Sequence, residues 1–214
     1  MNIDPGNGEP LDLVLASASP RRSELLRQIG VRFRVVPADV DEAVRPGEKP
    51  ADYVVRLARA KAVEVMSREG GALPVLGSDT AVILDGDILC KPRDRADAER
   101  MLGRLSGRTH EVFSAVALAL SPERVLHRLN VTRVTFAELE PEWIRAYCET
   151  GDPMDKAGAY AIQGLAAVFM LSLTLGSVDI PLKDILKILV GQEPQRRGQR
   201  PQARQRFGVG GAHH

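Results

Sequence analysis

The stretch VLGSDTAVILDGDILCK, residues 75–91, decides the fold class, because two strand-like runs flank the dipeptide Asp85-Gly86. Asp-Gly readily adopts the left-handed backbone of a two-residue turn and is therefore a strong hairpin signal. We predict antiparallel strands over residues 75–84 and 87–91.

On both sides of this hairpin, apolar residues recur with the period of a strand or of a helix. Short apolar or alternating runs predict strands at residues 13–16, 31–35, 111–120 and 125–136. Helical periods with start and stop signals predict helices at 20–29, 51–68, 94–105 and 141–148, a polar loop at 151–159, and a last strand end and helix at 179–190. Because strands and helices interleave while hairpins are also present, we expect an α/β domain with a mixed sheet and flanking helices.

The helix at residues 20–29 has clear end signals. Ser19-Pro20 offers an N-cap residue and a proline at the first helical position, and Gly30 follows the last turn. We expect Leu25, Leu26 and Ile29 to form the apolar face of this helix.

Length and charge describe an ordinary globular protein of 214 residues, with 29 Lys plus Arg, 28 Asp plus Glu and a net charge of +1. We expect one domain over residues 11–191, between a flexible lead-in at residues 1–10 and a basic, disordered tail at residues 192–214. Balanced charge makes nucleic acid an unlikely partner, and no apolar stretch is long enough for a membrane span. Without a CxxC motif or a secretory signal, the expected location is the cytoplasm.

The first candidate site is SASPRR, residues 17–22, where a predicted strand turns into a helix. The hydroxyls of Ser17 and Ser19, the guanidiniums of Arg21 and Arg22 and the free N–H groups of the helix start suit a phosphate. The alternative is an ordinary N-cap with two solvated arginines. Cations at a helix N-terminus oppose the helix dipole, which favours an anion between them.

Two charged residues fall where apolar ones are expected. Lys61 lies on the inward face of its helix, where it snorkels to solvent, pairs with a carboxylate or lines a phosphate cleft. Asp79 interrupts an apolar strand, which is costly unless the carboxylate is paired or opens on a site. The hairpin register places Thr80 opposite Lys91, so Asp79 either pairs with Lys91 or is aimed at a site by a bulge at Gly77.

The polar loop DPMDKAGAYAIQG, residues 152–164, offers Asp155, Lys156 and Gln163 as ligand contacts. Three acidic residues after the predicted strand at 31–35 are either surface charge or magnesium ligands: Asp39, Asp41 and Glu42. Motifs for dinucleotide, Walker-type, zinc-protease and serine-hydrolase sites are absent from the sequence. The remaining carboxylates, lysines and arginines suit metal-assisted attack of water on a phosphate.

Taken together, the segments resemble the Maf family of nucleoside triphosphate pyrophosphatases. The matching pieces run in family order over about 150 residues: LASASPRRSELLRQIGV (15–31), VDE (40–42), LARAKA (57–62), VLGSDTAVILDGDILCKPRD (75–94), MLGRLSGRTHEVFSAVAL (101–118) and GDPMDKAGAYAIQG (151–164). SPRR and DKAGAYxIQG are individually specific.

The resemblance implies a Maf/inosine-triphosphatase-like fold with two lobes around a central cleft, usually as a homodimer. It implies hydrolysis of a nucleoside triphosphate to the monophosphate and pyrophosphate with a divalent cation, Mg²⁺ or Mn²⁺, in a nucleotide housecleaning role. Asp79 corresponds to the catalytic base. Glu42, a candidate metal ligand, corresponds to the polar cleft lining, as do Ser17, Arg21, Arg22, Lys61, Lys91, Asp155 and Lys156.

Three positions indicate the substrate class. Arg21, Thr80 and Gln163 match the family branch that acts on dTTP and UTP, so we expect these two substrates. A nucleotide- or nucleic-acid-binding regulator linked to septum formation, with little hydrolysis, is the main alternative, and a purine-type housecleaning enzyme is the third. The segment at 169–182 is shorter than in the family and departs from its pattern, and Ser78 and Ala161 are milder departures.

Overall fold

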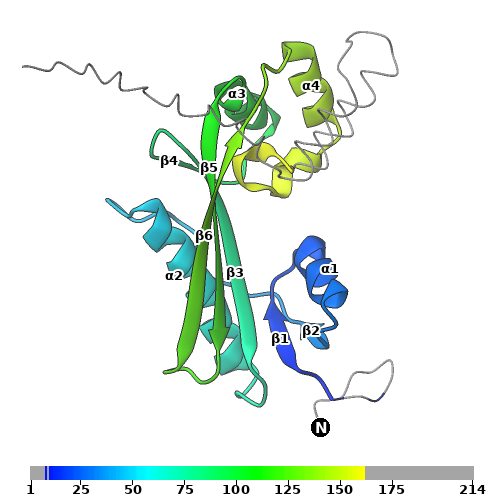
Figure 1. Cartoon of the computed structure of the whole chain (residues 1–214), viewed down its shortest axis with the longest axis vertical. Coiled ribbons are helices and arrows are strands. Elements are labelled where there is room, and N and C mark those ends of the chain that lie inside the picture. Colours follow the sequence, from blue (N-terminus) through cyan, green and yellow to red (C-terminus); the bar gives the residue numbers. More distant parts are fainter. Residues whose placement is uncertain (1–7, 9, 162–214) are drawn as a thin grey trace, which may run out of the picture.

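The computed structural model describes Gly8 and residues 10–161. Within them six strands form one mixed sheet in the order β2-β1-β3-β5-β6, with β4 paired to β3 (Figure 1). The strands are β1 (Leu13–Ala16), β2 (Phe33–Val35), β3 (Val75–Leu84), β4 (Asp87–Leu89), β5 (Thr109–Ala119) and β6 (Val125–Thr135). The helices are α1 (Pro20–Gln28), α2 (Pro50–Arg68), α3 (Arg95–Leu105) and α4 (Pro141–Glu149). The predicted α/β class is confirmed, and these elements begin and end within two residues of their predicted bounds.

The sheet is mixed because β1 runs parallel to β2 and β3, while β3, β4, β5 and β6 pair antiparallel. The predicted hairpin is confirmed: Asp85 and Gly86 have positive φ angles of 55° and 89°, as its turn requires. Val82 pairs with Leu89 in the predicted register, although β4 ends there, before Lys91.

Two apolar cores share strand β3, whose alternate residues point to opposite faces. Ala81 and Ile83 belong to a core covered by α2, together with residues of β1 and β5. Val82 and Leu84 belong to a second core built from α3, α4 and the segment that ends at Tyr160. Figure 1 shows α2 along the lower part of the long strands and α3 and α4 near their upper end. These two cores agree with the expected two lobes.

Strand β3 has a break in its pairing on one side. There β1 pairs with β3 up to Gly77, and β4 begins to pair at Val82. On the other side, β5 pairs with β3 continuously from Val75 to Ile83. Within the described chain, residues 78–81 of β3 therefore have no strand neighbour on the β1 side. This break positions the candidate site.

Helix α1 begins at Pro20 after Ser19 as predicted, but the Ser19 side chain makes no capping hydrogen bond. The Oγ atom of Ser17 accepts a hydrogen bond from the Ser19 N–H at 3.2 Å instead. The expected apolar face is only partly covered: Leu26 is half-buried, but Leu25 is 49% exposed and Ile29 73% exposed. The buried residue of α1 is Ser23.

The predicted loop at 151–159 contains two 3-10 turns, η1 (Asp152–Asp155) and η2 (Ala157–Ala159). Gly158 has a φ of 67°, and a Cβ there would lie 2.8 Å from the Val82 side chain. The loop therefore packs closely on β3. Among the described residues, no helix has the length and apolar character that a membrane crossing requires. The predictions for 162–191 and 192–214, and nearly all of the lead-in, lie outside the described residues.

Candidate active site

Arg22 occupies the break in the sheet. Its Nη1 atom donates to the Ser78 carbonyl oxygen at 2.8 Å and to the Ser17 Oγ at 3.2 Å, and its Nη2 lies 3.5 Å from the Thr80 Oγ1. The guanidinium thus supplies a hydrogen bond to β3 where a neighbouring strand is missing. Its pKa is lowered by burial, although Asp79 and Glu42 oppose that effect.

Asp79 points to the face that α2 covers, because it alternates with Gly77 and Ala81 on β3. Helix and strand approach very closely at Gly77, where a Cβ would lie 2.2 Å from the Ala58 carbonyl oxygen and 2.7 Å from the Ala62 nitrogen. This approach brings Lys61 within reach of Asp79. The Lys61 Nζ donates to the Asp79 Oδ1 at 2.7 Å.

Lys61 is shared between two carboxylates. Its Nζ also lies 2.6 Å from the Glu42 Oε1, while the Lys91 Nζ lies 3.5 Å from the Glu42 Oε2. The expected alternatives for Asp79 are therefore both wrong: its partner is Lys61 rather than Lys91, and regular pairing of β3 with β5 leaves no bulge at Gly77. For Lys61 the expected pairing with a carboxylate is confirmed.

The two carboxylates have opposite pKa shifts. Burial raises the pKa of Asp79 above its ordinary value, against the opposing effect of Lys61 and Arg22. Burial acts in the same direction on Glu42, but hydrogen bonds and charge from Lys61 and Lys91 outweigh it and lower the pKa. The raised pKa makes Asp79 the better candidate to accept a proton.

The cluster formed by Ser17, Arg22, Glu42, Lys61, Asp79, Thr80 and Lys91 is called the Asp79 cluster below. Three cations and two carboxylates leave it with one net positive charge, which favours an anionic ligand. A buried carboxylate of raised pKa beside several N–H donors can accept a proton while the donors bind phosphate oxygens.

Other predicted site residues lie outside these direct contacts. The Lys156 Nζ bonds the Asp155 Oδ1 at 2.6 Å and the Asp152 carbonyl oxygen. This loop is tied to the strand end beside the cluster, because the Gly158 N–H donates to the Cys90 carbonyl oxygen at 3.1 Å. Arg21 is exposed in the first turn of α1, beside Ser19, and Gln163 lies outside the described residues.

Tyr53 is a site neighbour that the sequence prediction missed. Its hydroxyl donates to the Glu42 carbonyl oxygen at 3.0 Å and lies 3.8 Å from the Cys90 Sγ. A signal was present, because Tyr53, Leu57 and Lys61 follow one another at intervals of four and share one helix face.

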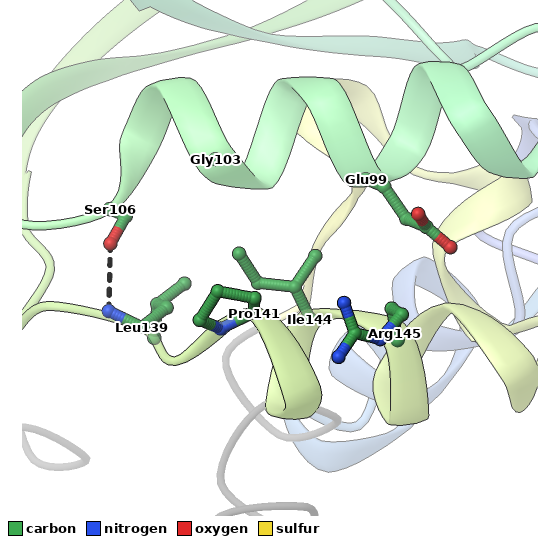
Figure 2. A pocket seen from close by; sticks show the side chains of 7 residues that line it. All are labelled: Glu99, Gly103, Ser106, Leu139, Pro141, Ile144 and Arg145. Carbon is green, nitrogen blue, oxygen red and sulfur yellow. Dashed lines mark hydrogen bonds between the residues drawn. The ribbon is translucent and has the colours of Figure 1, made fainter.

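A hollow between α3 and α4 is a separate feature (Figure 2). Ile144, Pro141 and Leu139 line it, and Glu99 and Arg145 lie toward one end. The hollow lacks the convergence of buried charge found at the Asp79 cluster, so we do not take it for the active site.

The fold and the cluster define an α/β protein with a cluster of cationic side chains around a buried carboxylate, at a break in its sheet. The family model described as Maf-like protein matches residues 12–179. The chain belongs to the Maf family.

Several curated relatives of the chain carry the same name. A dTTP/UTP pyrophosphatase of Symbiobacterium thermophilum is 51% identical over 181 residues, which cover 83% of this chain and 92% of the relative. A protein of the same name from Escherichia coli O6:K15:H31 is 49% identical, with coverage of 83% and 91%. A solved structure of a HAM1 protein from Coxiella burnetii aligns over 77% of this chain and 98% of its own, at 20% identity and a TM-score of 0.42, a likeness too low to add to the assignment.

Proposed function

We propose that the protein hydrolyses dTTP and UTP to the nucleoside monophosphate and pyrophosphate. The observation that carries the proposal is the buried Asp79 carboxylate, held against Lys61 and beside Arg22. The names and the identity of the curated relatives support both the reaction and the pair of substrates.

In the proposed reaction Asp79 is the general base. Its carboxylate takes a proton from a water molecule, the water oxygen attacks a phosphorus of the α–β anhydride, and the bond to the bridging oxygen breaks to release pyrophosphate. A pKa raised by burial makes Asp79 more basic, while Lys61 holds it ionised. Arg22, Lys61 and Lys91 would neutralise the charge that develops on the leaving pyrophosphate.

A divalent cation, Mg²⁺ or Mn²⁺, fits the donor set. The described residues contain no group of three or more His, Cys, Asp or Glu side chains that could hold a metal ion by themselves. Glu42 and Asp79 nevertheless converge on one ammonium, and Mg²⁺ is commonly held by one or two carboxylates together with substrate phosphates. A cation bound there would polarise the phosphate and add positive charge. Glu42, the more exposed carboxylate, is the proposed ligand.

Three residues are the proposed determinants of substrate choice: Arg21, Thr80 and Gln163. Thr80 supports this role by its place, because it adjoins Asp79 and its hydroxyl lies 3.5 Å from an Arg22 nitrogen. Phosphate contacts are proposed for Ser17, Ser19 and Lys156 in addition to the three cations of the cluster, and a substrate contact is proposed for Asp155.

The decisive experiment is an assay of pyrophosphate release from a panel of nucleoside triphosphates with Mg²⁺ or Mn²⁺. We expect dTTP and UTP to be the best substrates. Binding of dTTP without release would favour a nucleotide-binding regulator, and preference for inosine or xanthosine triphosphate would favour the purine-type enzyme. A homodimer in the cytoplasm is also proposed, and sedimentation of the full chain tests the dimer.

A further inference from the structure

The segment that carries Glu42 has little support of its own. Residues 36–49 connect β2 to α2 without helix or strand. Its first part is fixed by apolar contacts, since Val36, Ala38 and Val40 pack against the core under α2. After Val40 the side chains are mostly exposed, and that of Glu42 is itself 41% exposed. Besides its ion pairs with Lys61 and Lys91, the position of Glu42 therefore depends on contacts between its segment and other elements.

The first of these contacts comes from Tyr53. This residue is only 5% exposed, so its ring is fixed in the core, and its hydroxyl donates to the Glu42 carbonyl oxygen at 3.0 Å. Its hydroxyl also lies 3.8 Å from the Cys90 Sγ, next to Lys91. One buried side chain thus touches both segments that supply the Glu42–Lys91 pair.

The second contact comes from Arg56, on the next turn of α2. Its Nη2 atom donates to the Ala43 carbonyl oxygen at 3.0 Å, and its guanidinium binds both carboxylate oxygens of Glu48 at 2.5 and 2.8 Å. Glu48 in turn accepts from the Arg45 N–H at 3.1 Å, which fixes the far end of the segment. The guanidinium lies 5.5 Å from the centre of the Tyr53 ring, so the two contacts support each other.

We propose that Tyr53 and Arg56 are positioning residues for Glu42, which hold two successive backbone carbonyls so that its carboxylate lies between Lys61 and Lys91. Helix α2 also carries Lys61, so one rigid element sets both partners of the Glu42–Lys61 pair. The kinetic part of the test rests on the proposed pyrophosphatase function.

The kinetic test uses Tyr53→Phe and Arg56→Gln, each made in the full chain with and without Glu42→Ala. Tyr53→Phe keeps the ring and removes one hydrogen bond, so we expect kcat/KM for dTTP to fall about 3- to 10-fold. Arg56→Gln frees the segment further, and we expect a loss on the order of 10- to 100-fold, mostly in kcat. In the Glu42→Ala background neither substitution should lower kcat/KM further, because the residue through which it acts is gone.

Arg68→Gln is the matched control. Arg68 also lies on α2, donates to the Pro37 carbonyl oxygen in the same connection and pairs with a helix glutamate, Glu64. It contacts the connection far from Glu42, so kcat/KM should stay near wild type. Arg56→Lys should recover part of the activity lost in Arg56→Gln, since lysine keeps the charge but not the fork geometry.

Hydrogen exchange separates this inference from the proposed function, because it needs no turnover. The Ala43 and Arg45 amides donate to the Asp41 Oδ1 at 2.9 Å and the Glu48 Oε2 at 3.1 Å, so both should be protected in the wild type. Arg56→Gln should speed exchange in a peptide spanning residues 41–48, and Arg68→Gln should not. Wild-type protein that releases no pyrophosphate would contradict the proposed function and leave this measurement intact. Unchanged exchange in Arg56→Gln would overturn the positioning role. So would a further fall in kcat/KM when Tyr53→Phe or Arg56→Gln is added to Glu42→Ala.

Discussion

The long strand β3 and helix α3 each carry a buried aspartate, and these two aspartates have similar exposure but opposite pKa shifts. Asp79 is 7% exposed and Asp97 is 6% exposed. Burial raises the pKa of Asp79, whereas the pKa of Asp97 is lowered, first by the Arg93 backbone N–H and further by the Arg93 and Arg100 guanidiniums. Low exposure therefore does not by itself make a base. The depth of burial and the donors around the carboxylate together decide the direction of the shift: burial is the largest effect on the pKa of Asp79, whereas the hydrogen bond from the Arg93 backbone is the largest effect on that of Asp97.

The positions of these aspartates on their elements explain the difference. Asp97 lies in the first turn of α3, where its own N–H bonds the capping Asp94 side chain and nearby donors are plentiful. Asp79 lies in the middle of a strand between Gly77 and Ala81, and its carboxylate accepts a hydrogen bond from Lys61. A helix start surrounds the Asp97 carboxylate with donors, whereas the strand interior buries the Asp79 carboxylate beside Lys61.

Substitution of each aspartate by asparagine gives the largest contrast. Asp79→Asn should lower kcat for dTTP by about 10²- to 10⁴-fold, because the amide cannot accept the proton. Its melting temperature should be equal to or above that of the wild type, since a buried charge is removed and Lys61 keeps its ion pair with Glu42. Asp97→Asn should show the reverse, with activity near wild type and a lower melting temperature. Wild-type turnover by Asp79→Asn would end the base assignment.

Removal of the cationic partner of each aspartate should change the free energy of unfolding by different amounts. Lys61 is 11% exposed and the facing Asp79 side chain 9%, so Lys61→Met leaves a buried carboxylate unpaired, at a cost of about 3–5 kcal/mol in the free energy of unfolding. The rising limb of the pH–activity profile should move to higher pH. Arg93 is 80% exposed, and Arg93→Gln should cost no more than about 1 kcal/mol. Urea denaturation measures both, and equal losses would contradict the comparison.

Glycine substitutions test the close packing that serves the Asp79 site. Gly77→Ala would place a Cβ against the backbone of α2, and overpacking of this kind costs about 1–3 kcal/mol. Activity should fall as well, because Lys61 is displaced with its helix. At Gly103 in α3 an added Cβ would meet no atom within 4 Å, and Gly103→Ala should stabilise the protein by up to about 1 kcal/mol. Thermal unfolding and dTTP turnover of both variants provide the measurement.

The pH dependence of stability should have opposite signs at the two aspartates. The lowered pKa of Asp97 stabilises the fold above about pH 3.9, the unfolded-state value, and this contribution is lost as the pH falls through the folded value. The raised pKa of Asp79 contributes to the stability of the fold below the unfolded-state pKa. This contribution is lost as the pH rises through the folded-state pKa. Each unit of pKa shift is worth about 1.4 kcal/mol. Urea midpoints between pH 3 and 7, compared with those of each Asn variant, test both signs.

Much of the fold could be predicted from local patterns. The Asp85-Gly86 turn fixes the hairpin register, and the strand at Leu13–Ala16 and the helix at Pro50–Arg68 agree with their apolar periods. The apolar face predicted for α1 is only partly covered, because periodicity shows which side of a helix is apolar, not whether another element covers it. Ile29 remains exposed for that reason.

The candidate site could be predicted by residue type but not by pairing. Asp79 and Lys61 stood out because charge in an apolar pattern requires compensation. Their partnership was missed, because it depends on the approach of α2 to β3 at Gly77, which no local pattern encodes. Tyr53 was missed because a buried tyrosine on an apolar helix face usually belongs to the core.

The sequence by itself determined the elements, the hairpin, the unusual charges at Lys61 and Asp79 and the resemblance to the Maf family, because each depends on neighbours along the chain. The tertiary structure decided which charge meets which. Lys61 binds Asp79 and Glu42, Arg22 fills the break between β1 and β4, and α2 holds the Glu42 segment. These contacts join residues 11 to 56 positions apart, so they are set by how helix and sheet pack rather than by any local preference.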